Sequence, residues 1–169
     1  MIRPIVKYGE HALHVPASPI TDITGDLREL ARDMAETMYA APGIGLAAPQ
    51  IGLPIRMFVI DVSGGHDPRG LITLVNPEFV ERDGMQLEEE GCLSLPGFNA
   101  TVPRPERVTV KGLDLDGQER YFTGDGLLAR AFQLEMDHLD GRVFVDRLRG
   151  IKRDLIVRRI RKQIRAGTW

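Results

Sequence analysis

A glutamate and a histidine three residues apart could do chemistry in this chain, in the stretch Leu134-Glu135-Met136-Asp137-His138. Residues three and four apart share one face of a helix, so Leu134, Glu135 and His138 would project the same way. This spacing belongs to the pattern H-E-x-x-H, in which two histidines bind a metal ion and the glutamate moves protons. Here the first histidine position holds Leu134. The stretch therefore supplies one candidate ligand and one candidate proton carrier.

The single cysteine, Cys92, is a second candidate for chemistry, and three glutamates and a glycine precede it directly. One cysteine allows no intramolecular disulfide, which suits a reducing cytoplasm. In an intracellular chain with histidines elsewhere, a lone cysteine is a candidate nucleophile or metal ligand. The alternative is a small buried core residue.

A third segment, GIGLAAPQIG at 43–52, has three glycines and two alanines and few bulky side chains. Such a segment lets the backbone approach another backbone or a ligand closely. It lacks the Gly-Lys-Ser/Thr sequence of a phosphate-binding loop. We expect a loop or the start of a strand, with Gln50 buried.

Composition and charge limit the classes of function. A chain of 169 residues, 43% hydrophobic and 27% charged, predicts one globular domain with its own core. The net charge of -2 argues against DNA binding by the whole molecule. No apolar run is long enough to cross a bilayer, and the first residues lack the apolar core of a secretory signal. We therefore expect a cytoplasmic protein that does not bind membranes.

Hydrophobic periodicity and turn residues predict the elements that position these candidates. Residues 1–24, with three prolines, read as an extended arm. Helices are predicted over 26–39, 123–138 and 151–165. Strands are predicted over 56–62, 71–75 and 143–145, with Asn76-Pro77 ending the second of them. Two hairpins are predicted, at 79–88 around Asp83-Gly84 and at 107–123 around Asp116-Gly117.

Two of these helices carry a stripe that we expect to face inward. In the central helix the stripe consists of Leu127, Leu128, Ala131, Leu134, Glu135 and His138. In the last helix it consists of Leu155, Ile156, Ile160 and Ile164. Seven lysines and arginines surround the second stripe, as a solvated helix face or as a contact for RNA.

Three stretches together, in their order and spacing, resemble the peptide deformylase family: GIGLAAPQ at 43–50, EGCLS at 90–94 and EMDHL at 135–139. The resemblance covers nearly the whole chain. It implies one α+β domain over residues 1–169, with small antiparallel and mixed sheets around a central metal-binding helix and with a C-terminal helix. It also implies metal-dependent hydrolysis of the N-formyl group from the formylmethionine of nascent polypeptides.

The family's metal site is implied by the same resemblance. One divalent ion, Fe²⁺ physiologically and Zn²⁺ or Ni²⁺ in preparations, would be held by Cys92, His138 and the residue at position 134. Leu134 cannot bind a metal. Glu90 and Arg104 are implied to pair and hold the cysteine loop.

The family's catalytic groups also have counterparts in this sequence. Glu135 would accept a proton from water and deliver it to the leaving amine. The Gln50 amide and the Leu93 backbone N–H would donate hydrogen bonds to the formyl oxygen. The basic last helix would contact the ribosome. The residues implied to hold the peptide and its methionine side chain are Ile44, Gly45, Gly91, Leu127 and Ala131.

Leu134 leaves several interpretations open. It could be a changed position in an active enzyme or the mark of a natural member with weak metal binding. Alternatively, His11, His14 or His66 could supply the third ligand, although none has a spacing that suggests it. The rival to a deformylase is a metal-poor, catalytically silent formyl-peptide-binding protein. A general zinc endopeptidase is less favoured, because no histidine follows His138.

Overall fold

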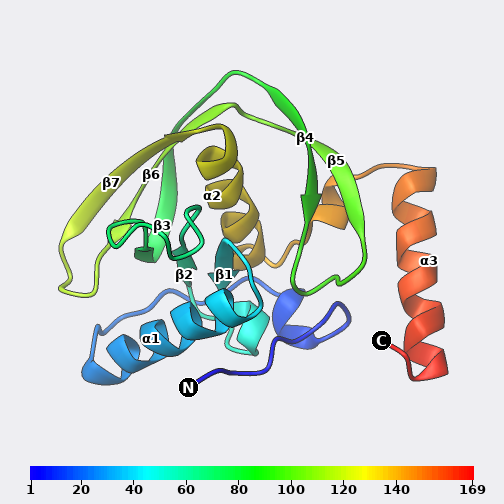
Figure 1. Ribbon diagram of the computed structural model, residues 1–169, viewed down its shortest axis with the longest axis horizontal. Coiled ribbons are helices and arrows are strands. Elements are labelled where there is room, and N and C mark those ends of the chain that lie inside the picture. The colour runs from blue at the N-terminus through cyan, green and yellow to red at the C-terminus, as the bar shows by residue number, and fades with distance from the viewer.

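Two helices cover the two faces of a five-stranded antiparallel sheet in a computed structural model that describes residues 1–169 (Figure 1). Helix α1 (Gly25–Ala40) lies on one face and α2 (Gly126–Leu139) on the other. The strand order is β1-β2-β3-β6-β7. The strands are β1 (Gly45–Ala47), β2 (Met57–Ile60), β3 (Ile72–Asp83), β6 (Arg107–Leu113) and β7 (Glu119–Asp125).

The alternation of side chains along β2 explains why both faces are covered. Phe58 and Ile60 pack in the core shared with α2, whereas Met57 and Val59 pack in the core shared with α1. Successive side chains of a strand point to opposite faces. All four are fully buried, so the strand has no solvent face. The apolar stripe of α1, formed by Leu27, Leu30, Met34 and Met38, packs against the sheet.

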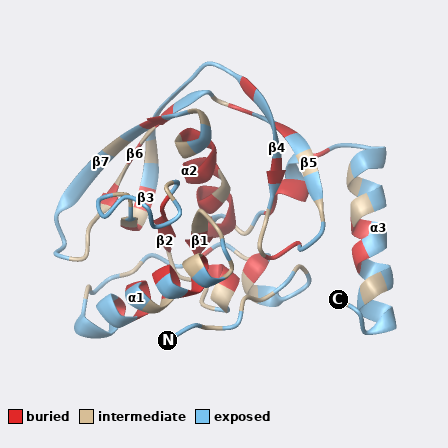
Figure 2. Ribbon diagram, viewed as in Figure 1, coloured by how far each residue is buried: buried red, intermediate tan, exposed pale blue.

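A second, two-stranded sheet lies on the other side of α2, as Figure 1 shows. Its strands are β4 (Gln86–Gly91) and β5 (Asn99–Arg104), and α3 (Ile151–Ala166) packs nearby. Three short 3₁₀ turns complete the structure: η1 (His11–Leu13), η2 (Ala48–Ile51) and η3 (Phe144–Arg147). Figure 2 shows α2 as a largely buried helix and α3 as a largely exposed one. No helix is both long and apolar enough to span a membrane.

The α+β class, the three helices and the hairpin of β6 and β7 are confirmed. The hairpin predicted around Asp83-Gly84 is wrong, because β3 pairs with β6 and β4 pairs with β5. Asn76-Pro77 also does not end a strand. The ladder shifts register between Val75 and Glu78, and β3 continues. Such a bulge accommodates a proline inside a strand.

In the C-terminal part, the predicted strand is wrong, and the predicted stripe of the last helix is correct only for Ile156 and Ile160. Residues 143–145 form no strand: Val143 caps η3, and Phe144 and Val145 are its first two residues. The Asp146 carboxylate accepts a hydrogen bond from the Val143 N–H at 2.9 Å. In α3, Leu155 and Ile164 are each 46% exposed, and Val157 and Ile160 are the buried residues. The helix therefore docks through a narrower stripe than its sequence suggests.

Candidate active site

A cavity of about 370 Å³ lies between α2 and two strands that each have an edge without a strand partner, β1 and β4. An extended peptide can pair with such edges. The cavity is lined by Pro42, Gly43, Ile44, Gly45, Gln50, Glu89, Glu90, Gly91, Cys92, Leu93, Leu127, Arg130, Leu134, Glu135 and His138. The three stretches singled out in the sequence therefore meet at one place.

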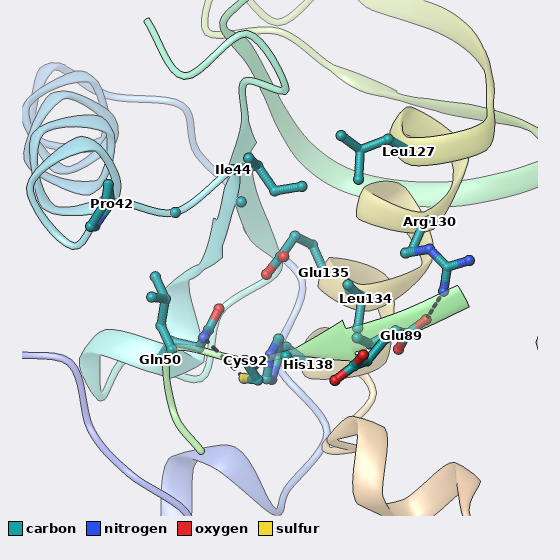
Figure 3. A pocket seen from close by; sticks show the side chains of 15 residues that line it. Pro42, Ile44, Gln50, Glu89, Cys92, Leu127, Arg130, Leu134, Glu135 and His138 are labelled. Atoms are coloured by element: carbon teal, nitrogen blue, oxygen red, sulfur yellow. Dashed lines mark hydrogen bonds and ion pairs between the residues drawn. The ribbon is translucent and has the colours of Figure 1, made fainter. Parts of the chain in front are cut away.

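Cys92, His138 and Gln50 converge at the base of the cavity (Figure 3). The Cys92 Sγ lies 3.4 Å from His138 Nε2. Gln50 is buried, as expected, and its Nε2 lies 3.7 Å from the same sulfur and 3.3 Å from Ser94 Oγ. Its Oε1 accepts a hydrogen bond from the Ala47 N–H at 3.0 Å, which directs the amide nitrogen toward the cysteine.

Glu135 reaches the cavity because Gly45 has no side chain. A Cβ built on Gly45 would lie 2.5 Å from the Glu135 Oε2, closer than real Cβ contacts allow. The other carboxyl oxygen, Oε1, is buried and has no hydrogen-bond partner, and the same is true of His138 Nδ1. Buried polar atoms rarely remain unpaired. The Glu135 carboxyl therefore has capacity for a hydrogen bond with a ligand.

Burial keeps the base of the cavity nearly uncharged at neutral pH. It raises the pKa of the Glu135 carboxyl to about 8 and that of the Cys92 thiol to about 12. It lowers the pKa of the His138 imidazole to about 4. At pH 7 all three groups are then mainly neutral. Such a site suits an uncharged ligand.

A buried network of charges fastens β4 to α2. Arg104 binds both carboxylate oxygens of Glu90 at 2.9 Å and one oxygen of Asp137 at 2.8 Å. The Glu90–Arg104 contact implied by the resemblance is therefore present. Arg130 adds a contact of 2.7 Å to Glu90, and Arg147 binds both carboxylate oxygens of Asp137. The network fixes the strand that leads directly into Cys92.

Arg130 and Arg147 were not singled out in the sequence. An arginine on an amphipathic helix is usually a surface residue. Arg130 is only 4% exposed, and its partners lie about forty positions earlier in the chain. The helical period places Arg130 on the face that carries Leu127 and Leu134, three and four residues away, and all three line the cavity. No local signal identifies its partners.

Four of the five residues expected to contact the substrate line the cavity, and one does not. Ile44, Gly45, Gly91 and Leu127 line the cavity. Leu127 is 52% exposed at its mouth, so its assignment to the inward stripe of the helix is wrong. Ala131 does not line the cavity; it is fully buried in the core between α2 and the five-stranded sheet. Consecutive residues of a helix point in different directions, so Ala131 faces the sheet although its neighbour Arg130 lines the cavity.

The donor set does not fit a metal centre with three protein ligands. A catalytic divalent metal normally has three such ligands and a fourth position for water. Cys92 and His138 supply two donors that face each other. Leu134 is half-buried in the cavity wall, and no group of three or more His, Cys, Asp or Glu side chains is placed to hold a metal ion.

None of the remaining histidines lies at the cavity beside Cys92 and His138. His11, His14 and His66 are exposed, and none lines the cavity. The His14 Nε2 accepts a hydrogen bond from the Gly9 N–H at 3.0 Å, and His66 Nδ1 lies 2.8 Å from the Ser63 carbonyl oxygen. Supply of a third ligand by one of them is therefore not supported.

Comparison with known proteins gives a consistent relationship. The family model described as polypeptide deformylase matches residues 2–154. A peptide deformylase of Acidobacterium capsulatum is 54% identical over 169 residues, which cover 100% of this chain and 99% of that protein. The crystal structure of a peptide deformylase from Legionella pneumophila superposes with a TM-score of 0.91 at 45% identity, covering 99% of this chain and 98% of that one. The structure of the peptide deformylase from Thermus thermophilus gives 0.90 at 41% identity, with the same coverage. This chain therefore belongs to the polypeptide deformylase family.

Proposed function

We propose that this protein is a peptide deformylase that acts on N-formylmethionyl peptides and whose hydrolytic activity is lowered by Leu134. The observation that carries the proposal is the convergence of Gln50, Cys92, Glu135 and His138 on one cavity beside two free strand edges. Deformylases are metal-dependent hydrolases of formylated nascent peptides. The proposal places the protein in the cytoplasm, where Fe²⁺ is the metal that we expect the family site to use.

The cavity residues divide the task of recognition. The main chain of Gly45 and Gly91, on the two strand edges, pairs with an extended peptide. The small residues around Gly45 leave room for a formyl group and little more. The Leu93 N–H makes no hydrogen bond within the protein, so it and the Gln50 amide can both donate to the formyl oxygen. Each such donor is typically worth about 10²–10³ in rate.

Hydrolysis adds water to the formyl carbon and breaks the C–N bond, which gives formate and a free amine. Glu135 accepts a proton from the attacking water and delivers it to the leaving nitrogen. Its pKa of about 8 leaves only a minority of the carboxyl ionised at pH 7. Water is also a weak nucleophile, and deformylases activate it with a bound metal ion. Cys92 and His138 alone are too few ligands to complete such a metal centre. Both features lower the expected rate.

A catalytically silent formyl-peptide-binding protein is the second candidate. Leu134 favours it, because this side chain places apolar surface where the family has its third ligand. Burying a divalent ion without adequate ligands is costly. The peptide-binding edges do not depend on Leu134, so binding would persist without turnover.

Formate release from N-formyl-Met-Ala separates these two functions. A slow deformylase releases formate, and Glu135→Gln lowers the rate by at least about 10²-fold, the usual effect of losing a general acid–base group. A silent binding protein binds the peptide and releases no formate. Formate release is then equally absent in Glu135→Gln and in the original chain. Peptide binding without any formate release would overturn the first candidate, and absence of binding would overturn both.

A further inference from the structure

A second hollow lies next to the catalytic cavity, between the two-stranded sheet and α3. Its volume is about 410 Å³. It is lined by Glu89, Asn99, Ala100, Thr101, Lys152, Leu155, Ile156 and Arg159. Glu89 lines both this hollow and the catalytic cavity, so the two adjoin at that residue. We propose that this hollow, the distal groove, binds the part of the formylated peptide that follows methionine and prefers acidic side chains there.

The path between the two sites crosses the exposed face of the small sheet. Glu89 on β4 lies directly opposite Thr101 on β5, and Gly91 lies opposite Asn99. Alternate residues of a strand share a face, and these four are all exposed. A peptide that pairs with Gly91 and leaves the catalytic cavity over Glu89 therefore meets β5 next and then α3.

The distance fixes which part of the peptide reaches the groove. Neighbouring strands lie about 4.8 Å apart, and an extended chain advances about 3.3 Å per residue, so crossing two strands takes about three residues. The groove is therefore reached at about the fourth to sixth residue of the substrate. Leu155, which is 46% exposed, and the half-buried Ile156 supply apolar contact there.

Two cations, Lys152 and Arg159, and one anion, Glu89, line the distal groove, and the excess of positive charge favours an acidic occupant. Lys152 and Arg159 are seven residues apart on α3, which places them on the same face of the helix. Both are exposed, and neither forms an ion pair within the protein. Arg158 and Lys162, on the same helix, do not line the groove. The preference for acidic residues should therefore depend on two particular cations rather than on the general charge of α3.

The inference rests on the proposed function, so its test begins with the minimal peptide. Binding is measured by competition of unlabelled peptides against a dye-labelled N-formyl-Met peptide, with mass spectrometry to show that the formyl group remains. The competitors are N-formyl-Met-Ala and hexapeptides of N-formyl-Met followed by alanines, with glutamate or with lysine at positions four and five. At low ionic strength the glutamate peptide should bind at least about threefold tighter than the lysine peptide, as expected for two exposed charge pairs.

Charge reversal locates the effect. Lys152→Glu with Arg159→Glu should reverse the preference, whereas the matched pair Arg158→Glu with Lys162→Glu should keep it. Equal affinity of the two hexapeptides, or the same change in both double variants, would overturn the distal groove while N-formyl-Met-Ala still binds. If N-formyl-Met-Ala itself does not bind, the proposed function fails, and the inference fails with it.

Discussion

The position of Glu135 depends on a residue that contributes no side chain. Gly45 lies on β1, and its bare Cα lets the carboxyl of α2 approach the strand. The types and spacing of Cys92, Glu135 and His138 were enough to single them out in the sequence. The sequence did not show that Glu135 requires a glycine at position 45, because these two residues lie ninety positions apart in the chain.

Gly45→Ala should therefore lower formate release strongly. The added methyl group must push the Glu135 carboxyl out of place, and misplacement of a reacting group by about 1 Å can cost about 10² in rate. The variant and the original chain are compared by formate release and by thermal unfolding. Gly25→Ala is the matched control, since a Cβ at Gly25 meets nothing within 4 Å. Unchanged activity in Gly45→Ala would show that Glu135 does not act from its present position.

At the scale of elements, α2 and α3 have opposite roles. Helix α2 is buried on nearly all sides and carries the reactive residues, whereas α3 exposes most of its surface (Figure 2). Both helices were predicted from the sequence, but the predicted buried stripe of α3 was wider than the one that the structure shows. The reason is that amphipathic periodicity shows which side can be buried and not how wide the receiving surface is. Only Val157 and Ile160 are buried in α3.

We predict that the exposed basic face of α3 contacts the ribosome, where formylated chains emerge. Neutralising Arg158, Arg159 and Lys162 to glutamine should weaken binding to ribosomes. Binding of the original chain should fall steeply as salt rises, because cations that contact RNA phosphates release counterions. Cosedimentation at several salt concentrations measures both effects. Equal binding by the two proteins at every concentration would leave the face as a solvated surface.

At the scale of the whole molecule, the sequence predicted the class of fold and the segments that form the site better than it predicted strand pairing. GIGLAAPQ, EGCLS and EMDHL each contribute residues to the wall of the cavity. They could be recognised without the fold, the first by its small residues and the other two by their cysteine, glutamate and histidine. The hairpin at Asp83-Gly84 failed because a turn dipeptide does not specify the partner of a strand. There the chain leaves one sheet and enters another, and long-range packing decided the pairing.

We propose that Leu134 occupies the position of a third metal donor, and placing a donor there tests this proposal directly. Leu134→His returns an imidazole four residues before His138, on the same helix face. Leu134→Ala is the control that removes the apolar wall without adding a donor. Metal content per chain and formate release from N-formyl-Met-Ala are measured for all three proteins after identical loading with Fe²⁺ or Zn²⁺. Both quantities should rise together in Leu134→His by at least about tenfold, the lower end of the effect of perturbing even the surroundings of a metal ligand, and should stay low in Leu134→Ala. Equal metal content and equal activity in the original chain and Leu134→His would contradict the account.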